Sequence, residues 1–258
     1  MKDITIIVPV HALNGDKDRE LFRTALDSVK KAQEKYTDSL VVMAVGPSAV
    51  KSEVSEIMDE MLGDTVKRVF QTNKGATDFC SQINCGAKHV KTDHFSILEF
   101  DDEYVTTWFD FVKKYYLTHE DVSVFLPIVV QGDENSKQYC NEVVWAMAFS
   151  NELGFIDEEC LANWPSFNLD GAVFSTKDFN LVGGYNAEIK LVFNYELLIR
   201  MCSQFGLKAY VVPRIGYGHL LGREGSLLNQ YNETMNDTEA MEWFAKAKAS
   251  FVKKNEEE

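Results

Sequence analysis

Three acidic residues lie close together in one short segment of the chain: Glu99, Asp101 and Asp102. They occupy the end of an apolar run at 95–100 that predicts a buried strand. Ligands of open α/β sheets bind beyond the carboxyl ends of strands, and clustered carboxylates are the hard oxygen ligands that Mg²⁺ and Mn²⁺ prefer. The alternative is a solvated acidic loop whose charges stabilise the start of the helix that follows. The cluster alone is compatible with either role.

The segments before this cluster alternate between short apolar runs and amphipathic stretches. Apolar, β-branched runs predict buried parallel strands, and apolar residues spaced by three and four predict helices. Strands are therefore expected at 4–10, 40–45 and 66–70, and helices at 21–36 and 52–62. Strand, helix, strand, helix, strand is the opening of a doubly wound α/β fold.

The second part of the chain continues with both kinds of element. Helices are expected at 77–90, 195–204 and 239–254, and strands at 122–130, 172–174 and 209–213. Helical and loop signals are mixed between 135 and 164, so no element is assigned there, and 255–258 are expected to fray. Because no repeat, linker or break in composition divides the sequence, one domain over 1–258 is expected.

Five short motifs follow one another at plausible spacing. They are the pair Asn73-Lys74-Gly75 and Asn84-Cys85-Gly86-Ala87, then Ile97-Leu98-Glu99-Phe100-Asp101-Asp102, Gly171-Ala172-Val173-Phe174, Val182-Gly183-Gly184-Tyr185-Asn186 and Tyr195-Glu196-Leu197-Leu198-Ile199-Arg200. In this order they resemble segments of the inverting family 2 glycosyltransferases, which have the GT-A fold. The resemblance covers roughly 4–230.

The resemblance implies a Rossmann-like, mainly parallel central sheet flanked by helices. A nucleotide-sugar-binding half at about 1–105 and an acceptor-binding half at about 106–235 would be fused, with a C-terminal helix at about 236–258. It also implies an enzyme that transfers a sugar from a nucleotide-sugar donor to an acceptor hydroxyl, with Mn²⁺ or Mg²⁺ bound at the donor diphosphate. The bound cation would neutralise the charge that develops on the leaving nucleoside diphosphate.

The resemblance assigns metal ligands by position. Asp101 matches the metal-binding Asp of the family's D-x-D motif, Glu99 replaces its first Asp, and Asp102 is expected beside the ligands or on a sugar hydroxyl. His219 follows the last predicted strand, where many GT-A enzymes have a histidine ligand. A lone histidine is equally compatible with a hydrogen-bonded position in a turn.

Other residues are expected to line the cleft for the donor nucleotide. From the end of the first strand and from the two Asn-x-Gly motifs, these candidates are Pro9, His11, Asn73, Gly75 and Asn84. Arg223 lies in a glycine-flanked segment and is suited to pair with phosphate oxygens, with a surface arginine as the alternative. His11 is equally suited to cap its loop.

The sequence departs from the family pattern at three places. The second strand ends in Val45-Gly46-Pro47-Ser48, where the family usually has an Asp that holds the nucleotide base, so UDP is not implied. The spacing from Gly75 to Asn84 is longer than usual. Phe193-Asn194 replaces the acidic pair that supplies the catalytic base, and Asn cannot take the acceptor proton. The candidates for that base are then Glu196, whose alternative role is a structural partner of Arg200, and Asp170.

Composition limits the partners. With 26 basic and 40 acidic residues the formal net charge is −14, which disfavours binding to nucleic acid. No run approaches the roughly 20 apolar residues of a spanning helix, and the protein is expected to be cytoplasmic. The acceptor is expected to be a sugar, a small molecule or a protein, and the aromatic residues of the acceptor half would stack on sugar rings or belong to the core. The main alternative is a nucleotide-sugar-binding or structural protein that has lost catalysis, which Asn194 favours.

Overall fold

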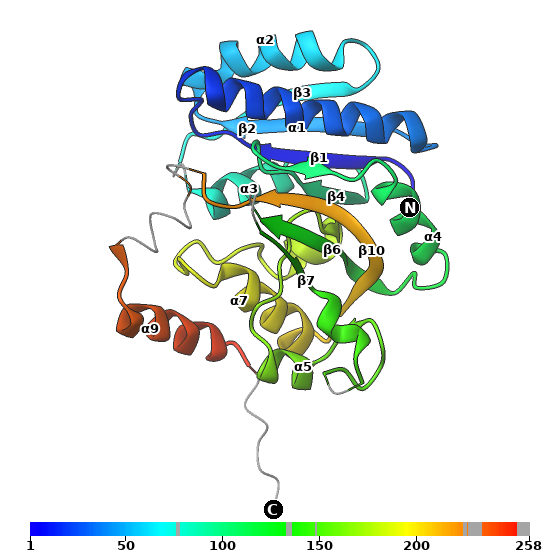
Figure 1. Cartoon of the computed structure of the whole chain (residues 1–258), viewed down its shortest axis with the longest axis vertical. Helices are drawn as coiled ribbons and strands as arrows, with labels where there is room; N and C mark the ends of the chain where they lie inside the picture. The colour runs from blue at the N-terminus through cyan, green and yellow to red at the C-terminus, as the bar shows by residue number, and fades with distance from the viewer. Residues whose placement is uncertain (76–77, 133–135, 148, 224–225, 227–233, 252–258) are drawn as a thin grey trace, which may run out of the picture.

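The computed structural model describes residues 1–75, 78–132, 136–147, 149–223, 226 and 234–251 (Figure 1). The strands within these residues are β1 (Ile4–Pro9), β2 (Leu40–Gly46), β3 (Lys67–Thr72), β4 (His94–Ile97), β5 (Glu103–Tyr104), β6 (Val122–Gly132), β7 (Lys137–Cys140), β8 (Phe155–Ile156), β9 (Val173–Ser175) and β10 (Lys208–Leu220). The α-helices are α1 (Gly15–Lys35), α2 (Lys51–Leu62), α3 (Phe79–Ala87), α4 (Trp108–Tyr116), α5 (Glu158–Asn163), α6 (Thr176–Leu181), α7 (Phe193–Ile199) and α9 (Asp237–Lys248). Two 3₁₀ turns, η1 (Ser48–Val50) and η2 (Glu142–Trp145), and one π-helical turn, η3 (Arg200–Gln204), complete the list.

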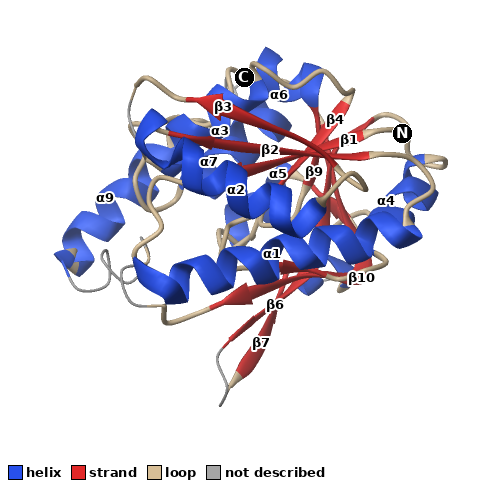
Figure 2. Cartoon of the chain, turned by 90° about the horizontal axis from the view of Figure 1, so that it is seen from above, coloured by secondary structure: helices blue, strands red, loops and turns tan. Residues whose placement is uncertain are grey.

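The strands form one mixed sheet in the order β3-β2-β1-β4-β9-β6-β10-β5, with β7 added to β6 and β8 added to β10. Strands β3, β2, β1 and β4 are parallel, and so are β6 and β10. Between them β9 runs antiparallel to both β4 and β6. Figure 2 shows the strands fanning out with the twist of a continuous sheet. The predicted α/β fold with a mainly parallel sheet is confirmed.

Strands β1, β2 and β4 are buried on both faces, which is why the runs at β1 and β2 read as continuously apolar. Side chains alternate along β1, so Ile6 belongs to one hydrophobic cluster and Ile7 to the other. Helices α1 and α2 supply Phe22 and Val54 to the first cluster, and α3 supplies Ile83 to the second. Helices α7 and α9 cover the lower part of the second cluster and lie side by side in Figure 1.

Several element boundaries differ from the predicted ones for local reasons. Helix α3 begins at Phe79 because the side chain of Asp78 caps it, and the predicted start at Thr77 lies outside the described residues. A capping box at Asn236 starts α9 at Asp237; the helix ends at Lys248, and 252–258 lie outside the described residues. The unassigned stretch 135–164 contains short elements, β7, η2, β8 and α5, that are too brief for a periodic signal.

The last strand differs most from its prediction. The expected strand at 209–213 is the first part of β10, which continues to Leu220 along β6 with β-bulges. His219 therefore lies within a sheet strand and not after it. None of the helices in the described ranges is long and apolar enough to cross a membrane.

Candidate functional site

Four side chains from three separate parts of the chain meet at one edge of the sheet. Glu99, Asp102, Asp170 and His219 each place one potential ligand atom so that all four atoms lie within 4.8 Å of one another. The turn after β4 carries Glu99 and Asp102, the loop before β9 carries Asp170, and β10 carries His219. The group is the only such cluster of potential metal ligands found among the described residues.

Backbone pairing brings Asp102 to His219. After β4 the chain turns, with Asp102 N donating to Glu99 O at 3.2 Å, and then forms β5, which pairs antiparallel with β10. Asp102 Oδ2 lies 2.9 Å from His219 Nδ1, and Asp102 Oδ1 accepts from Leu220 N at 2.9 Å. Tyr217, two residues earlier on β10, accepts from Glu99 N at 3.0 Å through its hydroxyl. Strand β10 thus fixes both ends of the acidic turn.

Asp170 is held in place by the loop in front of β9. Its backbone N–H donates to Asn168 Oδ1 at 2.6 Å, and its Oδ2 lies 3.4 Å from His219 Nδ1. The next residue, Gly171, has φ +70°, and a Cβ there would lie 2.4 Å from the ring of Tyr217. A glycine is required at this position because any side chain would displace the tyrosine that holds Glu99.

The pKa values of Glu99, Asp102 and His219 all lie above their ordinary values. Burial, together with the charges of Asp170 and Asp102, raises the pKa of Glu99 well above its usual range. Burial also raises the pKa of Asp102, to about 6, although its hydrogen bond with His219 acts in the opposite direction. Burial alone would lower the pKa of His219, but the hydrogen bond with Asp102 and the charges of Asp170, Asp102 and Glu99 raise it to about 10. These raised pKa values indicate that the site favours bound positive charge.

The donor set fits a divalent cation. Three carboxylates offer hard oxygen ligands and His219 offers an imidazole nitrogen, a combination suited to Mn²⁺ and compatible with Mg²⁺. A cation would replace the protons that the cluster otherwise retains, since metal ligands must be deprotonated. The structure thus brings the candidates Glu99 and His219 together and adds Asp102 and Asp170 to them.

Asp101 and Arg223 pair with each other outside this group. Arg223 Nε lies 2.5 Å from Asp101 Oδ2, its NH1 lies 3.6 Å from Asp18 Oδ1, and its guanidinium lies over the ring of Phe100. Asp101 was expected to bind the metal, and the structure instead directs its carboxylate to an arginine. Arg223 thus lies beside the acidic turn through its pair with Asp101.

The other donor-side candidates lie at the ends of β1 and β3 and on α3. Pro9 ends β1 and His11 follows it in an exposed position. At the end of β3, Asn73 Oδ1 accepts from Gly75 N at 3.0 Å. Asn84, in contrast, uses both ends of its amide on the backbone of Tyr185, at 2.7 and 2.8 Å.

Glu196 is engaged in a buried ion pair. Its two carboxylate oxygens accept from Arg200 Nε and NH2 at 2.8 and 2.7 Å, and Ser250 Oγ donates to it at 3.1 Å. Arg200 also donates to the carbonyls of Val182 and Gly184, so the pair ties α7 to the turn after α6. These contacts match the structural alternative for Glu196, and the structure does not place it in the acidic cluster.

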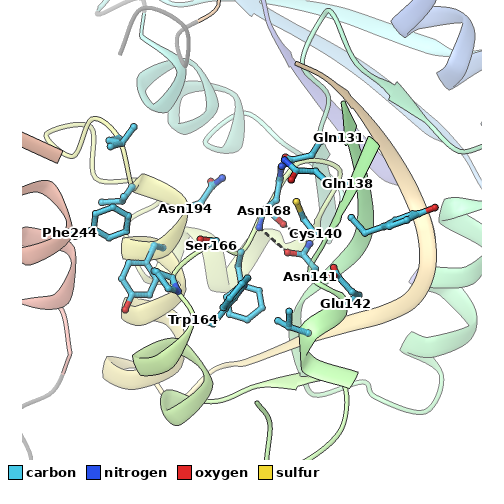
Figure 3. Close-up of a pocket in the computed structure, with 17 residues that line it drawn as sticks. Gln131, Gln138, Cys140, Asn141, Glu142, Trp164, Ser166, Asn168, Asn194 and Phe244 are labelled. Carbon is cyan, nitrogen blue, oxygen red and sulfur yellow. Dashed lines mark hydrogen bonds between the residues drawn. The ribbon is translucent and has the colours of Figure 1, made fainter. Parts of the chain in front are cut away.

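A cavity of about 550 Å³ lies between the β6–β7 hairpin, the loop 164–168, α7 and α9 (Figure 3). Asn194, which the sequence resemblance placed where the family has its base, lines it, and Asn194 Oδ1 accepts from Tyr185 OH at 3.0 Å. Trp164 and Phe167 also line it, whereas Tyr185 belongs to the core. The sequence did not reveal this cavity, because its lining is drawn from 131 to 244.

The fold of this chain is similar to that of two solved glycosyltransferase structures. TarS 1–349 of S. aureus in complex with UDP-GlcNAc aligns with TM-score 0.64 and 12% identity over 89% of this chain. The mannosyltransferase PcManGT of Pyrobaculum calidifontis, in complex with GDP-Man and Mn²⁺, aligns with TM-score 0.66 and 15% identity over 95% of this chain. The chain spans 61% of the first structure and 64% of the second.

These likenesses confirm the predicted GT-A fold. No protein-family model matches the chain, and no curated protein matches its sequence.

Proposed function

We propose that this chain is a glycosyltransferase that passes a sugar from a nucleotide-sugar donor to an acceptor hydroxyl with the help of Mn²⁺ or Mg²⁺. The observation that carries the proposal is the cluster of Glu99, Asp102, Asp170 and His219 at the carboxyl end of β4. Ligands bind at such strand ends in open α/β sheets. The neighbours with UDP-GlcNAc and with GDP-Man and Mn²⁺ support a nucleotide-sugar donor and a divalent metal.

In this proposal Glu99, Asp102 and His219 hold the metal ion, and donor phosphates and waters complete its coordination. The ion would supply Lewis-acid stabilisation of the charge on the departing nucleoside diphosphate. Arg223 supplies a further positive charge when the donor phosphates draw it from Asp101. The donor occupies the half at about 1–105, and Pro9, His11, Asn73 and Gly75 contact its nucleotide.

Asp170 is the better placed of the two carboxylates proposed as the base. It belongs to the cluster and adjoins Asn168, which lines the acceptor-side cavity. Asp170 takes the proton of the acceptor hydroxyl, the oxygen attacks the anomeric carbon, and the bond from that carbon to the diphosphate oxygen breaks. Glu196 has both oxygens occupied by Arg200, which supports a structural role for it.

A catalytically lapsed nucleotide-sugar-binding protein is the second candidate. Asn194 favours this candidate, because it is an amide at the position of the family's catalytic base and cannot take a proton there as a carboxylate would. Donor binding would then persist without turnover.

Calorimetric titration with UDP-, GDP-, CMP- and dTDP-sugars, with Mn²⁺ and again with a chelator, tests the proposal. Binding of one donor that the chelator abolishes is expected, followed by slow metal-dependent hydrolysis of that donor. Binding without hydrolysis or transfer would favour the lapsed protein, and failure of every donor to bind a folded sample would contradict both. The variant Asp170→Asn distinguishes two roles of that residue. If Asp170 is the base, the variant loses turnover but still binds the donor; if Asp170 is a metal ligand, the variant loses donor binding as well.

A further inference from the structure

The acceptor-side cavity has an unusual lining for a protein with so many charged residues. Its polar side chains are mostly amides: Gln131, Gln138, Asn141, Asn168 and Asn194. Among the described residues that line it there is no Lys, Arg or His, and Glu142 is the only carboxylate. The volume of about 550 Å³ is within the usual range for sites that bind small molecules.

Several of these amides are available to a ligand. The side chains of Gln131 and Gln138 make no hydrogen bond to another residue in the described part of the chain. Asn194 uses only Oδ1, so its NH₂ group is unengaged within the same residues, and in Figure 3 it faces the two glutamines across the cavity. Asn141 differs, because it is buried and bonded to Pro127 and Asn168.

An amide side chain both donates and accepts hydrogen bonds, as a hydroxyl group does. A set of unengaged amides therefore matches the dense hydroxyl pattern of a sugar. Trp164, half-buried in the lining, offers an aromatic face beside them, and such a face packs well on the apolar side of a sugar ring. Without a cation in the lining, a phosphate, sulfate or carboxylate group would find no charged partner there.

The cavity adjoins the acidic cluster through the sheet. Gln138 on β7 is paired with Gln131 on β6, and Gln131 is paired with His219 on β10. Residues paired across neighbouring strands project from the same face, so the two glutamines and His219 form one row. On the other side Asn168 accepts from the backbone of Asp170. Two lining residues, Gln131 and Asn168, are thus direct neighbours of cluster residues.

We infer that the cavity binds an uncharged saccharide as the acceptor and disfavours acceptors that carry phosphate, sulfate or carboxylate. The inference rests on the proposed glycosyltransferase function and adds the chemical class of its acceptor. Glu142 at the rim and the net charge of −14 both act against anionic molecules.

The test uses the full chain, fluorescently labelled, with Mn²⁺ and the nucleoside diphosphate that the donor titration selects. It is applied to an array of neutral oligosaccharides and of the same oligosaccharides carrying sulfate, phosphate or sialic acid. Neutral glycans are expected to bind at least about tenfold more tightly than their anionic counterparts. This difference in affinity corresponds to the free energy of about one hydrogen bond. Gln138→Lys places a cation in the cavity and is expected to narrow this difference by strengthening anionic binding. Gln204→Lys, the same substitution at an exposed site outside the cavity, is the matched control and leaves the difference unchanged.

Two results would overturn the inference. One is binding of anionic glycans equal to or tighter than that of their neutral counterparts. The other is the absence of any glycan binding by a chain that still binds and hydrolyses its donor, which leaves the proposed function intact. If donor binding also fails, both the inference and the proposed function are rejected.

Discussion

Glu196 is either a structural partner of Arg200 or the catalytic base, and the variant Glu196→Gln distinguishes these two roles. The glutamine keeps the shape of the side chain but removes its charge, so the guanidinium of Arg200 loses its buried partner. The side chains of Glu196 and Arg200 are only 3% and 15% exposed. Breaking a buried pair at one partner costs about 3–5 kcal/mol. For a chain of this size that corresponds to a fall in melting temperature of roughly 6–20 °C.

Calorimetric melting and donor hydrolysis are measured together on the variant. A structural role predicts the large loss of stability and an unchanged hydrolysis rate for the folded fraction at low temperature. A general base would instead contribute about 10²–10⁴-fold to the rate. The matched control is Glu60→Gln, which breaks the exposed pair with Arg23 and should change the melting temperature little, because solvent screens that pair. If Glu196→Gln melts like this control, or melts normally and loses hydrolysis by 100-fold, Glu196 is not the structural partner of Arg200 inferred above.

Three further predictions concern other sites. Burial lowers the pKa of His94 to about 4 in the folded chain, against 6.5 in the unfolded chain. As pH drops from about 6.5 to 4 the unfolded state therefore binds this proton first, and stability falls by up to about 3 kcal/mol. His94→Phe should reduce this dependence of stability on pH, measured by chemical denaturation at a series of pH values. Gly171→Ala should lower the melting temperature because its Cβ would lie 2.4 Å from the Tyr217 ring, and unaltered melting would contradict the crowding. Because Asp170 is the proposed base, Asn194→Asp should leave transfer activity nearly unchanged, and a large rise would instead show that the absence of a carboxylate at this position limits the rate.

The sheet could be predicted from the sequence because its central strands are buried on both faces. Residues such as Ile4, Ile6 and Ile7 are fully buried, so β1 reads as an unbroken apolar run. Short elements such as β5, with two residues, gave no signal, because they exist only through pairing with a distant strand. The full length of β10 was missed for a related reason, since its second part contains glycines and depends on pairing with β6.

The sequence named the residues of the cluster among its candidates but did not indicate how they are arranged. Glu99, Asp102, Asp170 and His219 were all candidates, yet nothing local indicated that Asp102 would face His219 while Asp101 faced Arg223. That choice follows from the pairing of β5 with β10, which joins segments more than 100 residues apart. The periodicity of apolar residues along the sequence does not predict such pairing between distant strands.

In the proposed site the acidic cluster binds the metal with Asp102 and without Asp101. Titration of Mn²⁺ into the wild type, Asp102→Asn and Asp101→Asn, followed by the EPR signal of the free ion, distinguishes the two carboxylates. We expect Asp102→Asn to weaken Mn²⁺ binding by at least about tenfold, as loss of a group at a metal site does. Asp101→Asn, which disturbs only the pair with Arg223, is expected to leave binding nearly unchanged. Loss of Mn²⁺ binding in Asp101→Asn with normal binding in Asp102→Asn would show that Asp101, and not Asp102, belongs to the metal site.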